Sequence, residues 1–388
     1  MYLIPSLDGS GGAEQAIAAL TAPLADRGVS LEVVTLGRTG REGGAAPDAV
    51  ARTIAASGAQ VTGLTPGRRP AQVRELHALL RRRRPDLVHT TLFDADVIGR
   101  VAGRWASTPV VSSLVNVAYG PEQRANPAIS SWKLEAVRWI DRATGTTVRR
   151  FHALSPYVAE VMARRLRIRP DRIDVIPRGR DPRALGEPTP ERRRSVRHAL
   201  GIDDDRLVVV AAARHEYQKG LDVLVAAWPQ VRAAQPRARL LIGGRTGNQT
   251  GALESAIASQ GADAGIELLG RRDDVPDLMV AADVFVVPSR WEGFGSILVE
   301  AMALGANVVT TDVGPIPDVV GAGWARLVPP EDADALAASI SVAAAQPPAE
   351  AARRAEVARA RFAACYRIDV VADATASFYE RALGASSS

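Results

Sequence analysis

Short runs of Val, Ile and Leu recur along the chain between longer amphipathic stretches, and within these runs the apolar residues do not alternate with polar ones. Unbroken apolar runs of this kind are typical of strands buried on both faces of a parallel sheet. In the first half of the chain we predict strands at residues 2–5, 31–36, 60–64, 87–90, 110–113, 151–154 and 174–176. In the second half we predict them at residues 207–213, 239–243, 266–269, 284–287, 307–310 and 325–328.

Strands that alternate with helical stretches predict right-handed βαβ units and open parallel sheets, which bind ligands at the carboxyl ends of their strands. A chain of 388 residues exceeds the usual size of one core. The Pro- and Gly-containing segment 177–182 interrupts the pattern near its middle and is the expected hinge. We therefore expect two α/β domains, 1–180 and 181–365, followed by a C-terminal helix and tail over 366–388.

The last part of the chain, residues 351–383, has a helical pattern but no strand of its own. Its apolar anchors are Phe362, Tyr366, Val370, Phe378 and Tyr379. Residues 384–388 are Gly, Ala and three Ser, and we expect them to be disordered.

Composition excludes several classes of protein. Cys365 is the only cysteine, so neither an intrachain disulfide nor a cysteine-based metal site is possible. No apolar run approaches the roughly 20 residues of a membrane span, and no basic leader precedes the first apolar residues. We expect a cytoplasmic protein without an integral membrane segment.

The net charge of +5 is carried almost entirely by arginine, because Lys133 and Lys219 are the only lysines. This bias is typical of a high-GC genome and does not by itself indicate nucleic-acid binding. The run Arg81–Arg84 could grip phosphate or an anionic membrane. It follows a helical stretch and precedes Pro85, and cations are stabilised at the carboxyl end of a helix, so we favour a solvated helix end.

The most informative motif follows the predicted strand 284–287 and opens a helix that we expect to end at Leu304, with Gly305 as its cap. Glu292 lies in the loop and Glu300 in the second turn of the helix. Either acid alone could be an ordinary solvated residue. Two acids with seven residues between them, spanning Gly293, Phe294 and Gly295 at a strand-to-helix junction, point to a ligand, because glycines allow close approach and helix amides suit phosphate.

This motif resembles that of the retaining glycosyltransferases of family 4. The resemblance implies a GT-B fold: two doubly wound Rossmann-like domains facing across a cleft, with a C-terminal helix that crosses back to the N-terminal domain. In that family the first acid contacts hydroxyls of the donor sugar, the glycine amides meet sugar and phosphate, and the second acid holds the ribose. The residues that would contact the donor here are Glu292, Gly293, Phe294, Gly295, Ser296, Ile297 and Glu300.

A second motif, residues 214–220, follows the strand that ends at Ala213. The family has an Arg and a Lys at this spacing, and both face the donor pyrophosphate, which implies that role for Arg214 and Lys219. A departing diphosphate needs its charge neutralised, and paired cations can do so without a metal. A solvated loop is the alternative. Because Lys219 is one of only two lysines, codon bias explains it poorly.

Gly11 and Gly12, after the first strand, resemble the family's glycine loop, which faces the donor phosphate from the other domain. A dinucleotide fingerprint starting at Gly9 would need a third glycine at position 14, which is Glu14. Hydride transfer on NAD is therefore disfavoured. Gly270 and Arg271 match the place where the family meets the nucleotide base. Gly243 and Gly244 could simply form a tight turn.

The acceptor side is less clear. The family usually carries a histidine after a first-domain strand, and here Asn116 stands in that segment; it can hydrogen bond but cannot act as acid or base. His89, Phe93 and Asp94 could line the acceptor site, although His89 could equally be a packed strand end. Asp94 and Asp96 are spaced as a metal pair might be, but no third ligand is near in sequence, and we expect no metal or other cofactor.

We therefore expect 1–180 to be the acceptor-side domain and 181–365 the nucleotide-sugar domain. The expected reaction is transfer of a sugar from a nucleotide diphosphate sugar, with UDP as the nucleotide, to a small-molecule or glycan acceptor, with retention. Glu292, Arg214, Lys219 and Asn116 are the candidate catalytic residues. The alternatives are a sugar nucleotide 2-epimerase of the same architecture and a noncatalytic sugar nucleotide binding protein.

Overall fold

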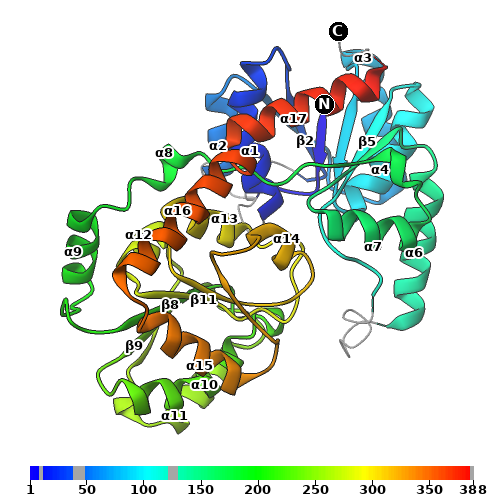
Figure 1. Cartoon of the computed structure of the whole chain (residues 1–388). Coiled ribbons are helices and arrows are strands. Elements are labelled where there is room, and N and C mark those ends of the chain that lie inside the picture. The colour runs from blue at the N-terminus through cyan, green and yellow to red at the C-terminus, as the bar shows by residue number, and fades with distance from the viewer. Residues whose placement is uncertain (8–11, 38–48, 121–129, 385–388) are drawn as a thin grey trace. The chain divides into compact units, whose positions relative to one another are not determined.

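The computed structural model describes residues 1–7, 12–37, 49–120 and 130–384. Its chain divides into two compact units, Met1–Arg180 with Cys365–Ser388 (unit 1) and Asp181–Ala364 (unit 2). In Figure 1 unit 1 runs from blue to teal and ends in the red helix α17, whereas unit 2 runs from green to orange. No described helix is both long and apolar enough to cross a membrane.

Unit 1 is built on one parallel sheet of seven strands in the order β3-β2-β1-β4-β5-β6-β7. Its strands are β1 (Tyr2–Ile4), β2 (Glu32–Thr35), β3 (Gln60–Gly63), β4 (Val88–Thr91), β5 (Val110–Leu114), β6 (Arg150–Ala153) and β7 (Ile173–Val175). Its helices are α1 (Gly12–Ala25), α2 (Ala49–Ala56), α3 (Arg69–Arg83), α4 (Phe93–Ala106), α6 (Ser131–Gly145), α7 (Pro156–Leu166), the 3-10 turn η1 (Pro170–Arg172) and α17 (Ile368–Leu383).

Unit 2 has a parallel sheet of six strands in the order β10-β9-β8-β11-β12-β13. Its strands are β8 (Val208–Ala212), β9 (Arg239–Gly243), β10 (Ile266–Gly270), β11 (Val284–Val287), β12 (Val308–Thr311) and β13 (Arg326–Val328). Its helices are α8 (Pro182–Leu185), α9 (Pro190–Ala199), η2 (Tyr217–Lys219), α10 (Leu221–Ala234), α11 (Thr250–Ser259), η3 (Ala262–Ala264), α12 (Val275–Ala281), α13 (Ser296–Leu304), α14 (Ile316–Val320), α15 (Ala333–Ala344) and α16 (Pro348–Cys365).

Every strand that the apolar runs predicted is present, within one or two residues of its expected bounds. The runs do not alternate because helices cover both faces of each sheet. In unit 1, Leu3 packs with α3 and α4 on one face, whereas its neighbours Tyr2 and Ile4 pack with α1 and α2 on the other. In unit 2, α10, α11 and α15 share one core with alternate residues of β8, β9 and β11.

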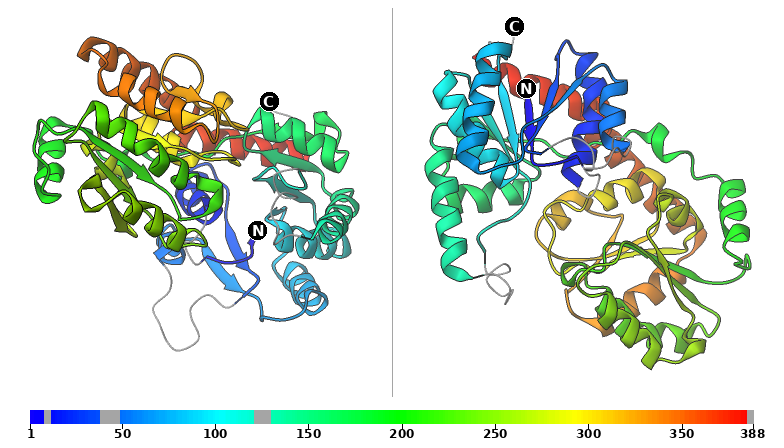
Figure 2. Two further views of the ribbon diagram at one scale, coloured as in Figure 1. Left: turned by 90° about the horizontal axis from the view of Figure 1, so that it is seen from below. Right: turned by 180° about the vertical axis from the view of Figure 1, so that it is seen from behind.

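The C-terminal segment differs from the single helical stretch that its pattern suggested. It forms two helices, because the chain leaves helical geometry at Arg367, which is extended with φ −63° and ψ 142°. α16 packs within unit 2, where Arg361 donates to the carbonyl of Val319 at 2.8 Å. α17 lies beside α1 in unit 1, as Figures 1 and 2 show, and buries Phe378 completely. Val370, expected to be an apolar anchor, is 37% exposed.

The predicted hinge segment pairs with the chain that enters α17. The amide of Arg180 donates to the carbonyl of Tyr366 at 2.8 Å, and the amide of Ile368 donates to the carbonyl of Arg180 at 3.0 Å. Gly179 is needed here because a Cβ atom at that position would lie 2.9 Å from the Cα of Ile368. The two segments that join the units thus run side by side in one parallel bridge.

A buried polar chain connects α17 with three strands of unit 1. His152 Nε2 lies 2.7 Å from the carbonyl of Ile176 and must donate to it, so its Nδ1 accepts from the hydroxyl of Ser113 at 3.1 Å. The Oγ of Ser113 then accepts from His89 Nε2 at 2.7 Å, and His89 Nδ1 accepts from the hydroxyl of Tyr379 at 2.8 Å. This order of donors and acceptors fixes each neutral imidazole in one tautomer.

Burial lowers the pKa of His152 to about 4 and lowers the pKa of His89 well below its ordinary value of 6.5. Below about pH 6.5 the unfolded chain binds protons on these two imidazoles, whereas the folded chain does not. The free energy of unfolding is therefore highest above pH 6.5 as far as these groups are concerned, and it falls as the pH falls. Burial raises the pKa of Asp96 to about 6, which acts in the opposite direction below pH 6.

We expect the free energy of unfolding to fall by about 2–3 kcal/mol between pH 7 and pH 5, because each histidine costs about 2 kcal/mol and Asp96 returns about 1 kcal/mol. Urea unfolding at the two pH values measures this. The variant His152→Gln keeps a donor and an acceptor but does not titrate, and its loss of stability should be smaller by about 2 kcal/mol. A stability that is flat or rises toward pH 5 would contradict the assignment.

Candidate functional site

The two motifs of the second half of the chain follow adjacent strands, β8 and β11, in the middle of the unit 2 sheet. These strands pair in parallel, with Val284 opposite Val209. Here the strand order changes direction, because the connection after β8 leads toward β9 and the one after β11 leads toward β12. The loops after such a pair diverge and leave a crevice at the carboxyl ends of the strands, which is where open α/β sheets bind ligands.

The loop after β11 leads into α13 as the sequence predicted. Glu292 lies in the loop, Glu300 lies in the second turn of α13, and Gly305 ends the helix with φ +66°. Gly295 is the residue before the helix and has φ +82°, and a Cβ atom there would lie 2.7 Å from a methyl of Ile316. Only glycine fits this position, where the chain turns into the first residue of α13, Ser296.

The remaining residues of this motif have different environments. Phe294 is buried, with 3% of its surface exposed, so it anchors the loop in the core of unit 2. Gly293, Ser296, Ile297 and Glu300 are half-buried. Their backbone and side chains lie at the surface of the loop and the first turns of α13.

The loop after β8 carries the two expected cations. Arg214 is exposed and Lys219 is half-buried. Lys219 ends the short turn η2, and Gly220 follows with φ +62°. A Cβ atom on Gly220 would lie 2.0 Å from the carbonyl oxygen of Pro288, so a glycine is required for the loops after β8 and β11 to touch.

Lys219 and Glu292 meet where these loops touch. The Nζ atom of Lys219 lies 2.6 Å from Oε1 of Glu292, and the hydroxyl of Ser289 donates to the same oxygen at 2.7 Å. Glu292 is buried, with 7% of its surface exposed. A buried carboxylate with one cation and one hydroxyl partner is a fixed polar group that can orient hydroxyls of a bound molecule.

Arg290 joins the same two loops and was not among the residues singled out from the sequence. Its guanidinium binds the carboxylate of Asp222 in a bidentate pair at 2.8 and 2.7 Å and donates to the carbonyl of Tyr217 at 2.7 Å. It also lies 3.9 Å from the ring centroid of Tyr217 and donates to Glu331 at 2.9 Å. The paired carboxylates raise the pKa of Arg290. In the sequence, the position of Arg290 between two glycine-containing loops could have drawn attention to it. Nothing in the sequence marks Asp222 as its partner.

The loop after β9 also approaches the loop after β8. A Cβ atom on Gly244 would lie 1.7 Å from the carbonyl oxygen of Ala213, so Gly244 permits a close backbone contact rather than only a tight turn. His215 is buried, its Nδ1 lies 3.2 Å from the hydroxyl of Thr250, and burial lowers its pKa. Arg271 is exposed after the edge strand β10 and pairs with Asp273 at 3.3 Å.

Unit 1 holds the other residues that the sequence singled out. Gly11 lies outside the described residues, and Gly12 is the first residue of α1. Asn116 is exposed in the segment after β5, where its Oδ1 accepts from the amide of Val117 at 2.8 Å. Phe93 begins α4 and carries the guanidinium of Arg69 5.2 Å from its ring centroid.

The remaining polar candidates of unit 1 are engaged with protein partners. Asp94 is exposed and paired with Arg69. Asp96 is buried and accepts from the hydroxyl of Thr90 at 2.5 Å, so the two aspartates have different partners. Across the described ranges no group of three or more His, Cys, Asp or Glu could hold a metal ion. His89 is 4% exposed and uses both ring nitrogens inside unit 1, which fits the packed-strand alternative.

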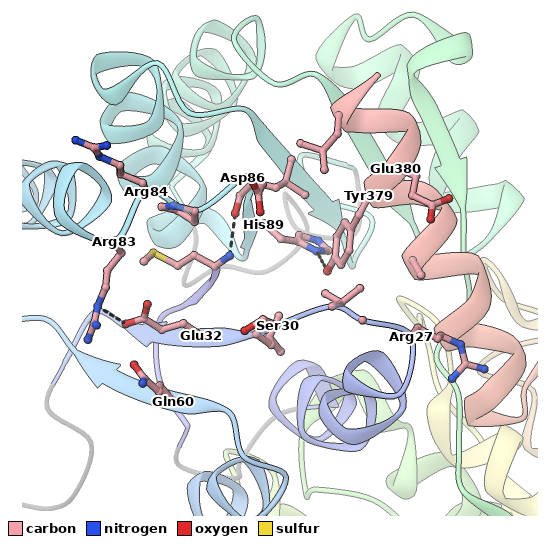
Figure 3. Close-up of a pocket in the computed structure, with 18 of the residues that line it drawn as sticks. Arg27, Ser30, Glu32, Gln60, Arg83, Arg84, Asp86, His89, Tyr379 and Glu380 are labelled. Atoms are coloured by element: carbon pink, nitrogen blue, oxygen red, sulfur yellow. Dashed lines mark hydrogen bonds and ion pairs between the residues drawn. The ribbon is translucent and has the colours of Figure 1, made fainter. Parts of the chain in front are cut away.

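A large cavity of about 630 Å³ lies in unit 1, at the amino ends of the strands of its sheet. Figure 3 shows it between the amino ends of β1, β2 and β4 and helix α17, lined by Arg27, Glu32, Arg83, Asp86 and Glu380 among others. Parallel sheets bind ligands at the opposite, carboxyl edge. None of the motif residues of unit 2 lines this cavity.

The fold identifies the class of protein to which the chain belongs. The chain superposes on a protein from Anabaena, Alr3699/HepE in complex with UDP, with a TM-score of 0.83 and 22% identity over 98% of this chain and 99% of the other. Two Rossmann-like domains with parallel sheets and this likeness define the GT-B fold of glycosyltransferases.

The family follows from the sequence comparisons. Residues 10–184 match the model described as Glycosyltransferase Family 4, and residues 204–346 match Glycosyl transferases group 1. The chain therefore belongs to the family 4, group 1 glycosyltransferases.

Curated relatives align with this chain over less than half of its length. A D-inositol 3-phosphate glycosyltransferase from Segniliparus rotundus is 36% identical over 162 residues, which are 39% of this chain and 34% of that protein. The lipopolysaccharide core biosynthesis mannosyltransferase LpsB from Rhizobium meliloti is 36% identical over 151 residues, 38% of this chain and 43% of that protein. The alignments thus span less than half the length of these relatives.

The contact at Gly220 gives a test of the site's construction. Gly220→Ala should push the loop after β8 away from Pro288, lowering stability by roughly 1–3 kcal/mol and weakening the binding of nucleoside diphosphate. Thermal unfolding and calorimetric titration with UDP measure the two effects. Gly251→Ala in α11, where a Cβ atom meets nothing within 4 Å, is the matched control and should leave both unchanged or slightly raise stability. Equal behaviour of the two variants would show that the loops do not need this contact.

Proposed function

We propose that the protein is a retaining glycosyltransferase that moves a sugar from a UDP-linked donor to a hydroxyl-bearing acceptor. The observation that carries the proposal is the Lys219–Glu292 pair at 2.6 Å, held between the loops after β8 and β11. A cation that can meet phosphate and a carboxylate that can meet sugar hydroxyls stand side by side there. A nucleotide diphosphate sugar carries both groups a few bonds apart.

We assign residues of unit 2 to each part of the donor in turn: the phosphates, the sugar, the ribose and the base. Lys219 and Arg214 bind the two phosphates, together with backbone amides at the start of α13. Glu292 accepts from hydroxyls of the sugar, and Glu300, further along α13, holds the ribose. Exposed Arg271 after β10 is proposed to contact the nucleotide base.

The chemistry of the step needs charge stabilisation more than acid catalysis. The bond between the anomeric carbon and the β-phosphate oxygen breaks, and the acceptor oxygen forms its bond on the same face of the sugar. The acceptor's proton passes to the leaving phosphate, and the nucleoside diphosphate leaves with its charge balanced by Lys219, Arg214 and the α13 amides. The anomeric carbon passes through an oxocarbenium-like state.

Similar proteins support the choice of donor. The Anabaena protein of the same fold was solved in complex with UDP-glucose as well as with UDP. The D-inositol 3-phosphate glycosyltransferase and the mannosyltransferase LpsB are each 36% identical to this chain over the aligned residues. We propose that the acceptor is bound by unit 1, with Asn116, Phe93 and Asp94 as the contacts.

The first experiment identifies the donor without knowledge of the acceptor. A panel of nucleotide sugars is tested for raising the melting temperature, and we expect UDP-sugars to raise it most, because binding to the folded state alone stabilises it. The best donor is then incubated alone. Slow hydrolysis to UDP supports transfer, conversion to the C2 epimer would make the protein an epimerase, and binding with no turnover would make it a binding protein.

Lys219→Met should lower turnover of the best donor by about two orders of magnitude, because it removes one fixed charge from the leaving group. The measurement is UDP release, with circular dichroism as the check on the fold. Arg194→Met, a change at an exposed cation of α9, is the control and should retain full activity. Full activity in Lys219→Met, or activity that EDTA abolishes and manganese restores, would reject charge balance by fixed cations.

The variants Glu292→Gln and Glu300→Ala should affect different measured quantities. Glu292→Gln should chiefly lower kcat, by roughly a hundredfold, since its carboxylate is proposed to act on the sugar. Glu300→Ala should chiefly weaken UDP binding, since its carboxylate is proposed to act on the ribose. Steady-state kinetics and UDP titrations separate the two, and equal losses of UDP affinity would contradict the assignment.

A further inference from the structure

Helix α6 presents an apolar stripe to solvent. Trp132 is 70% exposed, Trp139 is 57% exposed and Ile140 is 40% exposed. The exposed alanines 136 and 143 complete the stripe. These residues recur at intervals of three and four, so they share one face of the helix over about three turns. We call this face the α6 stripe.

The orientation of the stripe is fixed from the opposite side of the helix. Leu134 is buried in the core that α6 shares with β6 and α7. Asp141, two turns further on, is buried and accepts from Arg100 at 2.5 Å and from the hydroxyl of Tyr119 at 2.7 Å. Rotating α6 to bury the tryptophans would expose this ion pair partner and leave Arg100 buried without it, which is strongly unfavourable. The outward tryptophans are therefore a stable feature of the fold.

Cations flank the stripe on both sides. The ammonium of Lys133 lies 5.7 Å from the ring centroid of Trp132, and the guanidinium of Arg142 lies 5.1 Å from that of Trp139. The other cation of the helix, Arg138, is neutralised by Glu135 at 2.6 Å. Neither Lys133 nor Arg142 has an ion pair with a carboxylate in the described part of the chain. The net charge beside the stripe is thus positive.

We propose that the α6 stripe docks on an anionic phospholipid surface. Indole rings insert at the boundary between lipid headgroups and acyl chains, while lysine and arginine keep their charges at the level of the phosphates. Anionic headgroups attract the cations that border the stripe. Figure 1 shows α6 at the side of unit 1, and the described helices packed most closely against it are α4 and α7.

A second copy of the chain is a poorer occupant. A two-fold interface places the same patch on both sides. With this stripe it would bring Lys133 and Arg142 of one copy against the same cations of the other, with no free carboxylate on the helix to separate them. Like charges at a desolvated interface are unfavourable. The charge pattern therefore favours a lipid surface over self-association.

The inference does not depend on the proposed catalytic function, and its test uses neither donor nor acceptor. The full chain is mixed with phosphatidylcholine vesicles with and without phosphatidylglycerol, and binding is measured by co-sedimentation and by quenching of tryptophan fluorescence with bromine-labelled lipid. We expect binding only to the anionic vesicles, quenching of the exposed tryptophans, and weaker binding at high salt.

Matched variants locate the surface. Trp132→Ser with Trp139→Ser should weaken vesicle binding at least about tenfold and leave the melting temperature unchanged, because both side chains are exposed. Trp105→Ser is the control, since Trp105 is 58% exposed on α4 but packs against His77 rather than a cation. It should bind vesicles like the parent.

Three outcomes would overturn the proposal. The first is failure of the parent chain to bind anionic vesicles at low salt. The second is equal binding by the parent and the double tryptophan variant. The third is a dimer in sedimentation velocity that the double variant abolishes, which would show a second copy as the occupant. Loss of vesicle binding by the double variant, with an unchanged melting temperature, would support the α6 stripe and leave the proposed function untouched.

Discussion

The approach of two backbone loops in unit 2 is the constraint on which the candidate site depends. Gly220 has no side chain because the carbonyl of Pro288 occupies the space where a Cβ atom would lie, 2.0 Å away. Once the loops touch, Arg290 can bind Asp222 and stack on Tyr217, and Lys219 can reach Glu292. Each of these contacts joins residues of both loops. The close approach of the two backbones therefore permits the charged contacts of the site.

The division of labour between Arg290 and Lys219 follows from their partners. Arg290 is saturated by two carboxylates, a carbonyl and a ring, so its role is to hold the loops. Lys219 has one carboxylate partner and is half-buried, so part of its hydrogen-bonding capacity remains for a ligand. Arg214, which is exposed, has still more freedom. Arg290 thus holds the loops, and Lys219 and Arg214 are left to bind a phosphate whose charge changes during reaction.

The core of unit 1 depends on a different interaction, the packing of α17 within this unit. The helix lies far from the rest of unit 1 in sequence, and its Tyr379 completes a buried chain of hydrogen bonds through His89, Ser113 and His152. Without Tyr379, His89 would be left with an unpaired acceptor in the interior. The same unit turns the polar side of α6 inward, through Asp141, and its tryptophans outward. In both helices a buried polar contact decides which face meets the core.

The sequence by itself determined the strands, the parallel sheets and the positions of Glu292 and Glu300, because uninterrupted apolar runs and a glycine-rich strand-to-helix junction depend only on neighbours in the chain. Tertiary structure alone decided the partners. Asp222 carries no local mark of its pairing with Arg290, and His89 becomes a packed residue only because a helix 290 positions further on places Tyr379 beside it. The periodicity alone does not mark the break in helical geometry at Arg367, since α16 and α17 are both helical in pattern and their cores belong to different units. Periodicity is a local property, whereas pairing and burial depend on which surfaces the fold brings together.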